Sequence, residues 1–350
     1  MPGLSIIGTG RYLPGRPYTN HDLARVMETN DEWIRQRTGI AQRHFCPPGM
    51  GAVDLALPAC QAALEAARLG PADIDYVLFN TMTPDFLFPG SGSILAARLG
   101  CVGVPALDLR TQCAAMLFTF QVAESLLATG SARRILIVGA EAHGAVMPWR
   151  DWDILEGTRA GRPSAEDWDR ATANRGWAII FGDGAGAIVV ERAERPEAGI
   201  VGVDLHSDGR YAELLCIPAG FRRSSEPNAP NEIGTPLIHM DGRDVFKHAV
   251  TKLPRSIQAV CERARVPVES VDWFVAHQAN QRINEAVCER LGVSIDKMPS
   301  NIDRYGNTSA ATIPILLDEM RRDGRLREGQ LVCLAALGAG FHWGSILLRL

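Results

Sequence analysis

The stretch AALEAARLGPADIDYVLFN at residues 62–80 is matched 197 positions later by AVCERARVPVESVDWFVAH at residues 259–277. In both copies apolar residues recur at helical spacing, a short turn follows, and an aspartate leads into an apolar strand. Repetition at this distance indicates a chain made of two similar halves. Asn80 ends the strand of the first copy, and His277 ends the strand of the second.

The similarity continues on both sides of this stretch. Each strand leads through a loop into a helix that ends in Leu-Gly, at residues 99–100 and 291–292. GAIVVER at residues 186–192 resembles GSILLRL at residues 344–350, and a Gly-rich turn precedes each. Three matches in the same order make an accidental likeness improbable, so the duplication spans nearly the whole chain.

A further alignment concerns the segments that carry chemistry. LDLRTQCAAM lies over NIDRYGNTSA at an offset of 194, which makes Cys113 and Asn307 counterparts. We expect an N-terminal half at residues 1–195, which holds Cys113, and a C-terminal half at residues 196–350, which holds His277 and Asn307.

The order of the expected elements predicts the fold class. Strands that alternate with helices indicate mostly parallel sheets with helices on both faces. Two such halves bury their sheets most fully by sharing one central layer of helices. We therefore expect an α/β protein with five layers, αβαβα, and two pseudo-symmetric halves.

The composition bears on whether the protein binds nucleic acid, a membrane surface or a metal ion. The 36 basic and 40 acidic residues give a net charge of -4 and form no long block of one sign, so we expect neither nucleic acid nor a membrane surface as partner. The eight cysteines lack the spacing of zinc ligands, which argues against a disulfide framework and a bound metal. We find no signal-peptide pattern and no run of about 18 apolar residues, and expect a soluble cytoplasmic protein.

Cys113 follows the apolar segment ALDL and precedes AAMLFTFQVAESLLATG, whose apolar residues recur at helical spacing. The thiol is thus expected at a helix N-terminus, where free N–H groups and the helix dipole favour the thiolate. The alternative is a small buried cysteine at the start of a core helix. Its place in the duplicated scaffold favours a nucleophile.

Two further residues are candidates for the same site. His277 ends the strand DWFVAH, so its side chain should emerge at the carboxyl edge of a sheet, where ligands of α/β proteins gather. Asn307 begins the helix after the turn DRYGN, and an ordinary N-cap is the alternative for it. Pseudo-twofold symmetry is expected to bring the tips of the two central helices, with Cys113 and Asn307, together.

A thiolate beside two neutral hydrogen-bond donors, with no acidic group to orient the histidine, suits acyl transfer followed by stabilisation of an enolate oxygen. The Gly-rich turn GAGF at residues 338–341 could bring a backbone N–H toward the acyl carbonyl. Together with the amide of Cys113 it would form an oxyanion hole. GDGAG at residues 182–186 is better interpreted as a tight turn than as a phosphate loop.

An ordered set of motifs supports a resemblance to a known family. They are NDEWIRQRTGI (30–40), FP (88–89), TQCAA (111–115), RGWAIIFGDGAGA (175–187), LHSDGRYAELL (205–215), HQANQRI (277–283), RYGNTSAA (304–311) and GAGFHWGS (338–345). With these motifs the chain resembles the beta-ketoacyl-acyl-carrier-protein synthase III family of thiolase-like condensing enzymes, over essentially all of its length.

The resemblance implies a reaction. Cys113 would take an acyl group from acyl-CoA, and malonyl-acyl-carrier-protein would be decarboxylated while His277 and Asn307 hold the enolate oxygen. The enolate would then attack the thioester to give a 3-oxoacyl carrier protein and so initiate fatty acid synthesis. Acyl-CoA is a substrate in this scheme and no cofactor is expected. A homodimer is the expected assembly.

The resemblance also implies contacts for the substrates. Trp33 and Arg175 would enclose the CoA adenine, Phe88 would close the acyl pocket of the partner subunit, and the amides of Cys113 and Ala339 would form the oxyanion hole. The remaining expected substrate contacts are Arg37, Thr38, Gly242, Phe246 and Asn280. The expected docking patch for the acidic carrier protein consists of Arg243, Lys247 and Arg282.

Several positions depart from the family pattern. The residues after Cys113 are Ala-Ala-Met, and Ala339 stands where glycine is usual, so either its backbone avoids positive φ or strain is accepted there. Arg243 replaces a residue that is commonly small or an amide. Residues 147–174 form a connection about twenty residues longer than usual, which holds Trp149, Trp152 and Trp168. One interpretation is a surface excursion or an embellishment of a dimer interface, with the tryptophans buried. The other is a lid that shapes the acyl or acceptor site.

Two other functions remain open at this point. The altered flank of Cys113 and the long connection are compatible with a related acyltransferase or condensing enzyme of secondary metabolism, such as polyketide synthesis. A catalytically silent partner subunit is the third possibility, and the intact set of Cys113, His277 and Asn307 argues against it.

Overall fold

The computed structural model describes residues 3–195, 197–218 and 237–350. The expected boundary between the halves, at residue 196, lies outside the described residues, so the division of the chain there stays a prediction. The two main sheets belong to different parts of the chain. One is built from strands before residue 193 and the other from strands after residue 198.

The first sheet has five strands in the order β1-β7-β6-β4-β5. Strand β4 is parallel to both β5 and β6, whereas β7 is antiparallel to β6 and to β1. The strands are β1 (Leu4–Tyr12), β4 (Tyr76–Asn80), β5 (Ala106–Leu109), β6 (Arg134–Glu141) and β7 (Gly184–Arg192).

The second sheet has four strands in the order β11-β12-β13-β8. Only β11 and β12 are parallel, and the other two pairings are antiparallel. The strands are β8 (Gly199–Ser207), β11 (Trp273–Ala276), β12 (Leu331–Gly338) and β13 (His342–Arg349). The expectation of mostly parallel sheets was therefore wrong, because the short turn between β12 and β13 forces a hairpin and β7 returns antiparallel beside β6.

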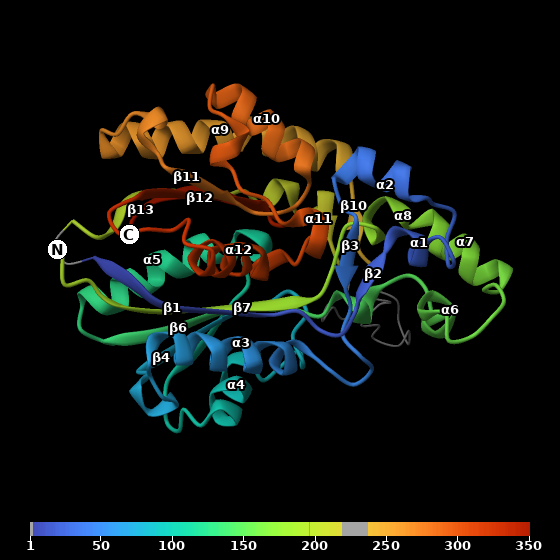
Figure 1. Ribbon diagram of the computed structural model, residues 1–350, viewed down its shortest axis with the longest axis horizontal. Helices are drawn as coiled ribbons and strands as arrows, with labels where there is room; N and C mark the ends of the chain where they lie inside the picture. The colour runs from blue at the N-terminus through green and yellow to red at the C-terminus, as the bar shows by residue number, and fades with distance from the viewer. Residues whose placement is uncertain (1–2, 196, 219–236) are drawn as a thin grey trace, which may run out of the picture.

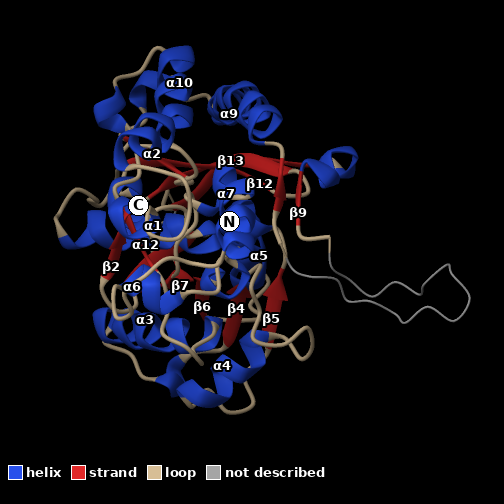
Figure 2. Ribbon diagram, turned by 90° about the vertical axis from the view of Figure 1, so that its right-hand side faces the viewer, coloured by secondary structure: helices blue, strands red, loops and turns tan. Residues whose placement is uncertain are grey.

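Helices form the other three layers (Figure 1). Helices α3 (Ala52–Ala67) and α4 (Ser91–Leu99) cover the outer face of the first sheet, and α9 (Gly242–Ala264) and α10 (Gln281–Leu291) cover that of the second. Helices α5 (Ala115–Ala128) and α12 (Thr312–Arg322) lie between the sheets, as Figure 2 also shows for α5. The five-layered αβαβα arrangement is confirmed.

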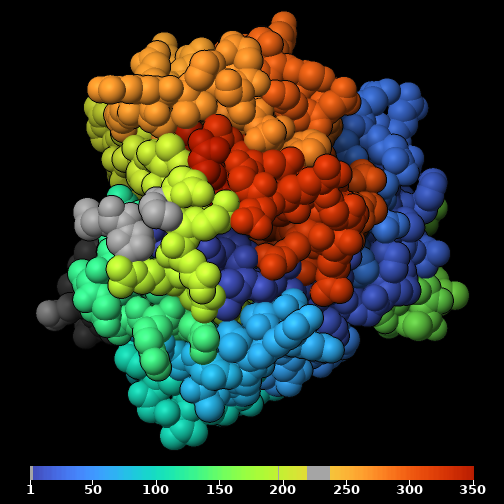
Figure 3. Space-filling model, turned by 60° about the vertical axis from the view of Figure 1, so that its left-hand side comes forward, coloured from blue at the N-terminus to red at the C-terminus, as the bar shows by residue number. Residues whose placement is uncertain are grey.

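The central layer is the shared core of the two halves. Leu117 and Phe120 of α5 and Leu316 of α12 are fully buried against apolar side chains from both sheets, including Ile137 and Leu334. At about 1.5–3 kcal/mol for each large apolar side chain removed from water, this layer is a main source of stability. Figure 3 shows the two parts of the chain in contact, the later one in orange and red over the earlier one in blue and green.

The structure corrects the predicted register of the duplication. A short 3-10 turn precedes each central helix, η2 (Gln112–Ala114) before α5 and η7 (Ser309–Ala311) before α12. Gln112 and Ser309 both have φ of 45°, so they are equivalent, and the offset is again 197. The counterpart of Cys113 is therefore Ala310. The offset of 194 was wrong because loops of different length let two short motifs align by chance.

A smaller body packs beside the layers, at the right of Figure 1. Its core joins the segment at residues 17–45 to the long connection at residues 147–174, and Trp149 is buried there against Phe45 and Trp152. Its elements are β2 (Pro17–Thr19), α1 (Asn20–Leu23), α2 (Asp31–Thr38), β3 (Gln42–His44), η3 (His143–Val146), α6 (Trp152–Glu156), α7 (Ala165–Ala173) and α8 (Arg175–Ala178). This burial agrees with a packed excursion.

The other elements are short and lie in connections. They are η1 (Pro71–Asp73), η4 (Gly209–Leu214), β9 (Leu215–Cys216), β10 (His239–Met240), η5 (Val268–Ser270), η6 (Ile295–Lys297) and α11 (Ile302–Tyr305). In the described part of the chain, no helix is long and apolar enough to cross a membrane.

Candidate active site

One cavity of about 500 Å³ brings the three candidate chemical residues together. Cys113, His277 and Asn307 all line it. Its wall also contains Trp33, Arg37, Thr38, Gly242, Arg243, Phe246, Asn280 and Arg282, all of them predicted substrate or docking residues. Among the described residues that line this cavity, none belongs to the connection at residues 147–174, so the lid hypothesis gains no support from it.

Cys113 lies within the 3-10 turn that leads into α5, and only 6% of its surface is exposed. Its Sγ is 3.3 Å from Oγ of Ser309, which belongs to the equivalent turn before α12. Burial raises the pKa of the Cys113 thiol to about 12, and the contact with Ser309 acts in the opposite direction. The predicted shift toward the thiolate was therefore wrong, because burial outweighs the helix terminus.

His277 follows β11 and is almost fully buried. Its Nδ1 is 2.7 Å from Oγ1 of Thr312, the first residue of α12, so Nε2 is the ring nitrogen left for the cavity. Burial lowers the pKa of His277 to about 3, which keeps the ring neutral at physiological pH. The ring is a neutral hydrogen-bonding group, as the sequence suggested.

Asn307 is held at both its backbone and its side chain. Its N–H donates to the carbonyl of Ile180 over 2.9 Å, and its own carbonyl accepts from the N–H of Gly182 over 3.1 Å. Its Oδ1 accepts from the N–H of Ser309 over 2.8 Å. The N-cap of the 3-10 turn is Thr308 and that of α12 is Ala311, so the capping interpretation of Asn307 was wrong, and its bond to Ser309 is of the Asx-turn kind. This bond leaves the amide nitrogen of Asn307 as the end that can donate to a bound oxygen.

The end of β12 lies against the nucleophile. A Cβ added to Gly338 would come within 2.9 Å of the backbone nitrogens of Cys113 and Ala114, so a side chain has no room there. In the described chain, the residues other than glycine with positive φ are Arg68, Gln112, Arg265 and Ser309. Ala339 therefore avoids positive φ. The turn instead uses Gly340, at φ of 134°.

The turn after β12 is clamped by residues of the LHSDGRY motif. Asp208 and Phe341 exchange two backbone hydrogen bonds, of 2.8 and 2.9 Å. Ser207 Oγ lies 2.7 Å from Nδ1 of His342. The position of Ala339, the expected second amide of the oxyanion hole, is thus fixed by a segment more than a hundred residues away in sequence. Sequence reasoning included the motif but gave it no role.

Sequence reasoning also missed Glu141, which ends β6 and is fully buried beside the site. Its carboxylate accepts from the N–H groups of Met82 and Ala310, at 3.0 and 3.3 Å, and from Thr83 Oγ1 at 2.9 Å. Burial raises the pKa of Glu141 to about 7, and these donors act in the opposite direction. It connects the loop after β4 to the turn that contains Ser309. A charged residue at the end of the apolar run RILIVGAE was the available signal.

At the outer end of the cavity, the Trp33 ring lies under two guanidinium groups. The Cζ atoms of Arg37 and Arg175 are 4.3 and 5.1 Å from its centroid. Arg175 also donates to the carbonyl of Glu28, whose N–H donates to Thr172 Oγ1 over 3.0 Å. Arg175 thus lies against Trp33 itself, held there by the end of the long connection, and the enclosure of the CoA adenine between the two stays a prediction.

The remaining predicted residues lie around this opening or away from it. Asn280 caps α10 and donates through Nδ2 to the carbonyl of Arg37 over 2.9 Å. The guanidinium of Arg282 lies over the Phe246 ring at 5.6 Å. Phe88 is 78% exposed on the loop between β4 and α4, and Lys247 lies on α9 outside the cavity wall. Their roles stay predictions.

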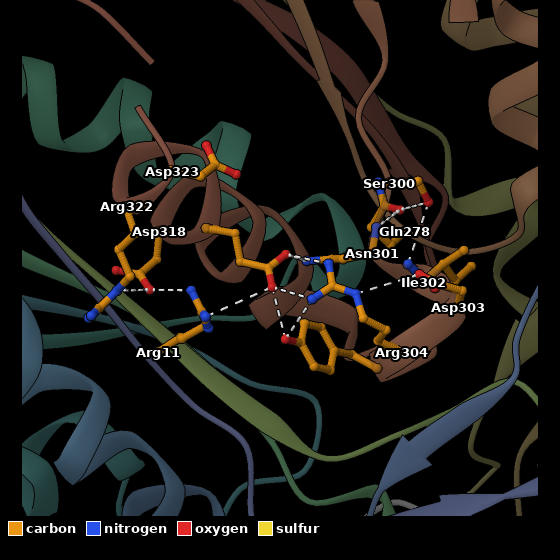
Figure 4. A network of polar contacts seen from close by, with 12 residues as sticks. Arg11, Gln278, Ser300, Asn301, Ile302, Asp303, Arg304, Asp318, Arg322 and Asp323 are labelled. Carbon is orange, nitrogen blue, oxygen red and sulfur yellow. Dashed lines mark hydrogen bonds and ion pairs between the residues drawn. The ribbon is translucent and has the colours of Figure 1, made fainter. Parts of the chain in front are cut away.

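A polar network supports the loop that carries Asn307 (Figure 4). Glu319 of α12 accepts from Asn301 Nδ2 at 2.9 Å, Arg304 Nη1 at 2.7 Å and Tyr305 Oη at 2.8 Å. The adjacent Asp318 accepts from Arg11 of β1 over 2.7 Å, which ties α12 to the first sheet. The chain just before Asn307 is thereby fixed to a central helix.

Comparison with known proteins identifies the family. The model of 3-oxoacyl-[acyl-carrier-protein] synthase III matches residues 107–158 and 163–209, and the model of its C-terminal part matches residues 261–350. A beta-ketoacyl-[acyl-carrier-protein] synthase III of Xylella fastidiosa strain 9a5c is 41% identical over 344 residues, 98% of this chain and 97% of that protein. The chain belongs to the 3-oxoacyl-[acyl-carrier-protein] synthase III family.

Solved structures of synthase III enzymes agree with this membership. The enzyme of Aquifex aeolicus VF5 superposes with a TM-score of 0.85 at 35% identity, covering 99% of this chain and 100% of that one. The enzyme of Pseudomonas aeruginosa PAO1 superposes with a TM-score of 0.84 at 35% identity, covering 99% of this chain and 98% of that one.

In the described residues, no group of three or more His, Cys, Asp or Glu side chains could hold a metal ion.

Proposed function

We propose that this synthase III family member condenses an acyl group from acyl-CoA with malonyl-acyl-carrier-protein, releasing CO2 and a 3-oxoacyl-acyl-carrier-protein, and so initiates fatty acid synthesis. One observation carries the proposal. A cysteine at the start of a central helix, a neutral histidine and an asparagine with a free amide nitrogen line one buried cavity, in a chain 41% identical to a named synthase III.

Cys113 is the proposed acyl acceptor. Its sulfur attacks the thioester carbonyl of acyl-CoA, and CoA leaves. The amide of Cys113 and that of Ala339, at the end of β12, are the proposed donors to the oxyanion that forms. The close approach of Gly338 to the Cys113 backbone supports this assignment, because it places the turn that contains Ala339 against the nucleophile.

His277 and Asn307 are the proposed donors to the malonyl thioester oxygen. Loss of CO2 leaves an enolate, and its negative charge is stabilised by hydrogen bonds that strengthen as the charge develops. Both side chains are already oriented, by Thr312 and by Ser309, so they need little reorganisation. The enolate carbon then attacks the acyl thioester on Cys113.

The opening of the cavity supports the proposed substrates. Trp33, Arg37, Thr38 and Arg175 offer an aromatic face, a hydroxyl and two cations for the nucleotide of CoA. We propose Gly242, Phe246 and Asn280 as further wall residues along the pantetheine path, and Arg243, Lys247 and Arg282 as the docking patch for the carrier protein. Acyl-CoA enters as a substrate, and no cofactor is proposed.

We also propose that the enzyme is a homodimer. Strand β5 is the outer strand of its sheet, and Leu107 on it is 42% exposed. The nearby loop exposes Phe86 and Leu87 by 58% each and Phe88 by 78%. Exposed large apolar side chains of this kind are typical of an interface. Light scattering should give twice the mass of the chain, and Leu87→Asp should reduce it.

We propose that the enzyme acts in a reducing compartment such as the cytoplasm. The eight cysteines, all of them unpaired in the structure, support this proposal.

The test mixes purified protein with acyl-CoA donors from acetyl to decanoyl and with malonyl-acyl-carrier-protein, and measures CO2 and the 3-oxoacyl product. Product formation from at least one donor is the expected result. Absence of both CO2 and product with every donor would refute the proposed function. The series also identifies the acyl length, which depends on pocket packing.

A second candidate is a priming enzyme of secondary metabolism. The priming beta-ketosynthase of the R1128 polyketide biosynthetic pathway superposes with a TM-score of 0.83 at 28% identity. The same assay separates the two, because a carrier protein of polyketide synthesis would then be preferred as acceptor over that of fatty acid synthesis.

A further inference from the structure

The two 3-10 turns that precede the central helices meet at the sulfur of Cys113. This Sγ lies 3.3 Å from Oγ of Ser309, and Ser309 is fully buried. Oγ of Ser309 also lies 3.4 Å from Sδ of Met82, on the loop after β4. A hydroxyl group from the second half of the chain therefore faces the reacting atom of the proposed nucleophile.

The backbone around Ser309 holds this hydroxyl in place. The N–H of Ser309 donates to Oδ1 of Asn307 over 2.8 Å, and its carbonyl accepts from Oγ1 of Thr312 over 3.0 Å. Ser309 has φ of 45°, which is uncommon for a residue other than glycine, and Gln112, the residue before Cys113, has the same φ. Backbone strain of this kind persists only where the surroundings impose it, and it clusters at active sites.

The contact with Ser309 opposes the main influences on the thiol. Burial, the largest of them, raises the pKa of Cys113, and the charge of Glu141 also raises it. The hydrogen bond with Ser309 lowers this pKa, and so does a weaker one with the backbone of Cys113. Of the described side chains, Ser309 is thus the one that most favours the thiolate.

The direction of this hydrogen bond depends on the charge of the sulfur. While Cys113 is a thiol it can donate to Oγ of Ser309, whose own proton then turns to the carboxylate of Glu141, a better acceptor than the thioether of Met82. A thiolate has no proton and can only accept, so Ser309 must then donate to it. The bond therefore strengthens as negative charge develops on the sulfur, which is the condition for accelerating a reaction.

We propose that Ser309 is a further catalytic residue, whose hydroxyl donates to the sulfur of Cys113 whenever that sulfur carries negative charge. This occurs twice in a turnover, when Cys113 attacks acyl-CoA and when the bond from its sulfur to the acyl carbon breaks at the end of condensation. Ser309 keeps its own proton throughout, so it adds no bond change to the reaction. The inference rests on the proposed function, because it assigns a donor to the nucleophile of that reaction.

Alkylation of Cys113 tests this donor without any substrate of the proposed reaction. Ser309→Ala removes the hydroxyl. Ser256→Ala is the matched control, because Oγ of Ser256 also bonds a carboxylate, that of Asp204 over 2.7 Å, at a buried position that does not line the cavity. The rate of alkylation by iodoacetamide is measured at one fixed pH, with peptide mass spectrometry to select the signal of Cys113 among the cysteines.

The expected effect follows from the charge of the thiolate. A hydrogen bond to a charged group changes an equilibrium by about 10- to 100-fold, and Ser309→Ala should lower the thiolate fraction of Cys113 by this factor. The thiolate that remains is more basic and more nucleophilic, which recovers about half of the loss on a logarithmic scale. Alkylation, and single-turnover acylation by acyl-CoA, should therefore slow by roughly 3- to 10-fold in Ser309→Ala and stay at the wild-type rate in Ser256→Ala.

A glycine variant separates the hydroxyl from the backbone of the turn. Ser309→Gly also lacks the hydroxyl, and glycine adopts φ of 45° without steric cost, so the turn is retained. Thermal melts establish that each variant is folded. Equal slowing in the alanine and glycine variants would assign the effect to the hydroxyl. Alkylation at the wild-type rate, or slowing in only one of the two variants, would overturn the proposal.

This inference and the proposed function fail in different ways. If the wild-type protein neither takes an acyl group nor condenses, the proposed function fails, whereas the alkylation rates still decide the role of Ser309. If the wild-type protein condenses and both Ser309 variants react at its rate, the proposed function stands and Ser309 is not a donor to the sulfur.

Discussion

The nucleophile's backbone is in contact with a glycine that cannot be enlarged. A methyl group at Gly338 would lie 2.9 Å from the nitrogens of Cys113 and Ala114 and 3.1 Å from Cβ of Cys113, whereas ordinary contacts begin at 3.4 Å. In Gly338→Ala, either the end of β12 or the turn of Cys113 must therefore move by about half an ångström. Both are backbone, so no flexible side chain can absorb the shift.

The displacement would act on the proposed oxyanion hole. Loss of one hole donor typically costs about 10²- to 10³-fold in rate, or about 3–4 kcal/mol of transition-state stabilisation. We expect Gly338→Ala to slow acylation by about this factor, with a smaller cost of roughly 1–3 kcal/mol in the free energy of unfolding from overpacking. Affinity for the CoA nucleotide should change little, because Trp33 and Arg37 are at the outer end of the cavity.

The assay is single-turnover acylation by acyl-CoA, followed by intact mass spectrometry, with a thermal melt to establish that the variant is folded. Gly70→Ala is the matched control, since its new methyl group would meet only Oδ2 of Asp73, at 3.8 Å. A folded Gly338→Ala protein that acylates at the wild-type rate would refute the reasoning about the hole.

Three further predictions concern other parts of the site. Asn307→Ala should still acylate Cys113 but should lose decarboxylation of malonyl-acyl-carrier-protein, measured as released CO2; equal loss of both steps would contradict its role. Because burial raises the pKa of Cys113 to about 12, alkylation by iodoacetamide should rise about tenfold per pH unit between pH 7 and 9, and a plateau in that range would contradict a thiol at rest. Although burial opposes its charge, hydrogen bonds from Arg304 and others hold the pKa of Glu319 below its usual value. Its carboxylate therefore stabilises the fold above the unfolded pKa of about 4.3, and Glu319→Ala should lower the free energy of unfolding by about 2–3 kcal/mol at pH 7 and by less at pH 4, as followed by denaturant melts.

The fold was largely predictable because both copies of the duplicated unit show clear helical and strand periodicity in the sequence. Helical and strand periodicities at residues 62–80 and 259–277 predicted α3 and β4 and identified α9 and β11 as their counterparts in the other half. Strand direction was not predictable in the same way, since β7 returns beside β6 only after a long connection. No local pattern shows on which side, or in which direction, such a strand will pair.

The site was predictable as a set of residues, and less so as an arrangement. Cys113, His277 and Asn307 do share a cavity, yet the residue equivalent to Cys113 is Ala310, and the symmetry argument for Asn307 used the wrong register. Asn307 reaches the cavity from the loop before the turn rather than from the tip of the helix.

The contacts missed from sequence depend on packing between distant segments. Thr312, Ser309 and Glu141 are ordinary residues of helix and strand ends, and only the meeting of the two turns gives them partners. The thiolate prediction failed for a related reason. A helix terminus can be recognised in a sequence, whereas the degree of burial that opposes it cannot.

The central claim is that Cys113 carries the acyl group that is then joined to the malonyl carbon. Its most direct test incubates the protein with acyl-CoA alone, maps the adduct by peptide mass spectrometry, and then adds malonyl-acyl-carrier-protein. We expect one acyl group on Cys113, which disappears as an equal amount of CO2 and 3-oxoacyl-acyl-carrier-protein forms. An adduct on another residue, or product formation by Cys113→Ala, would contradict the account.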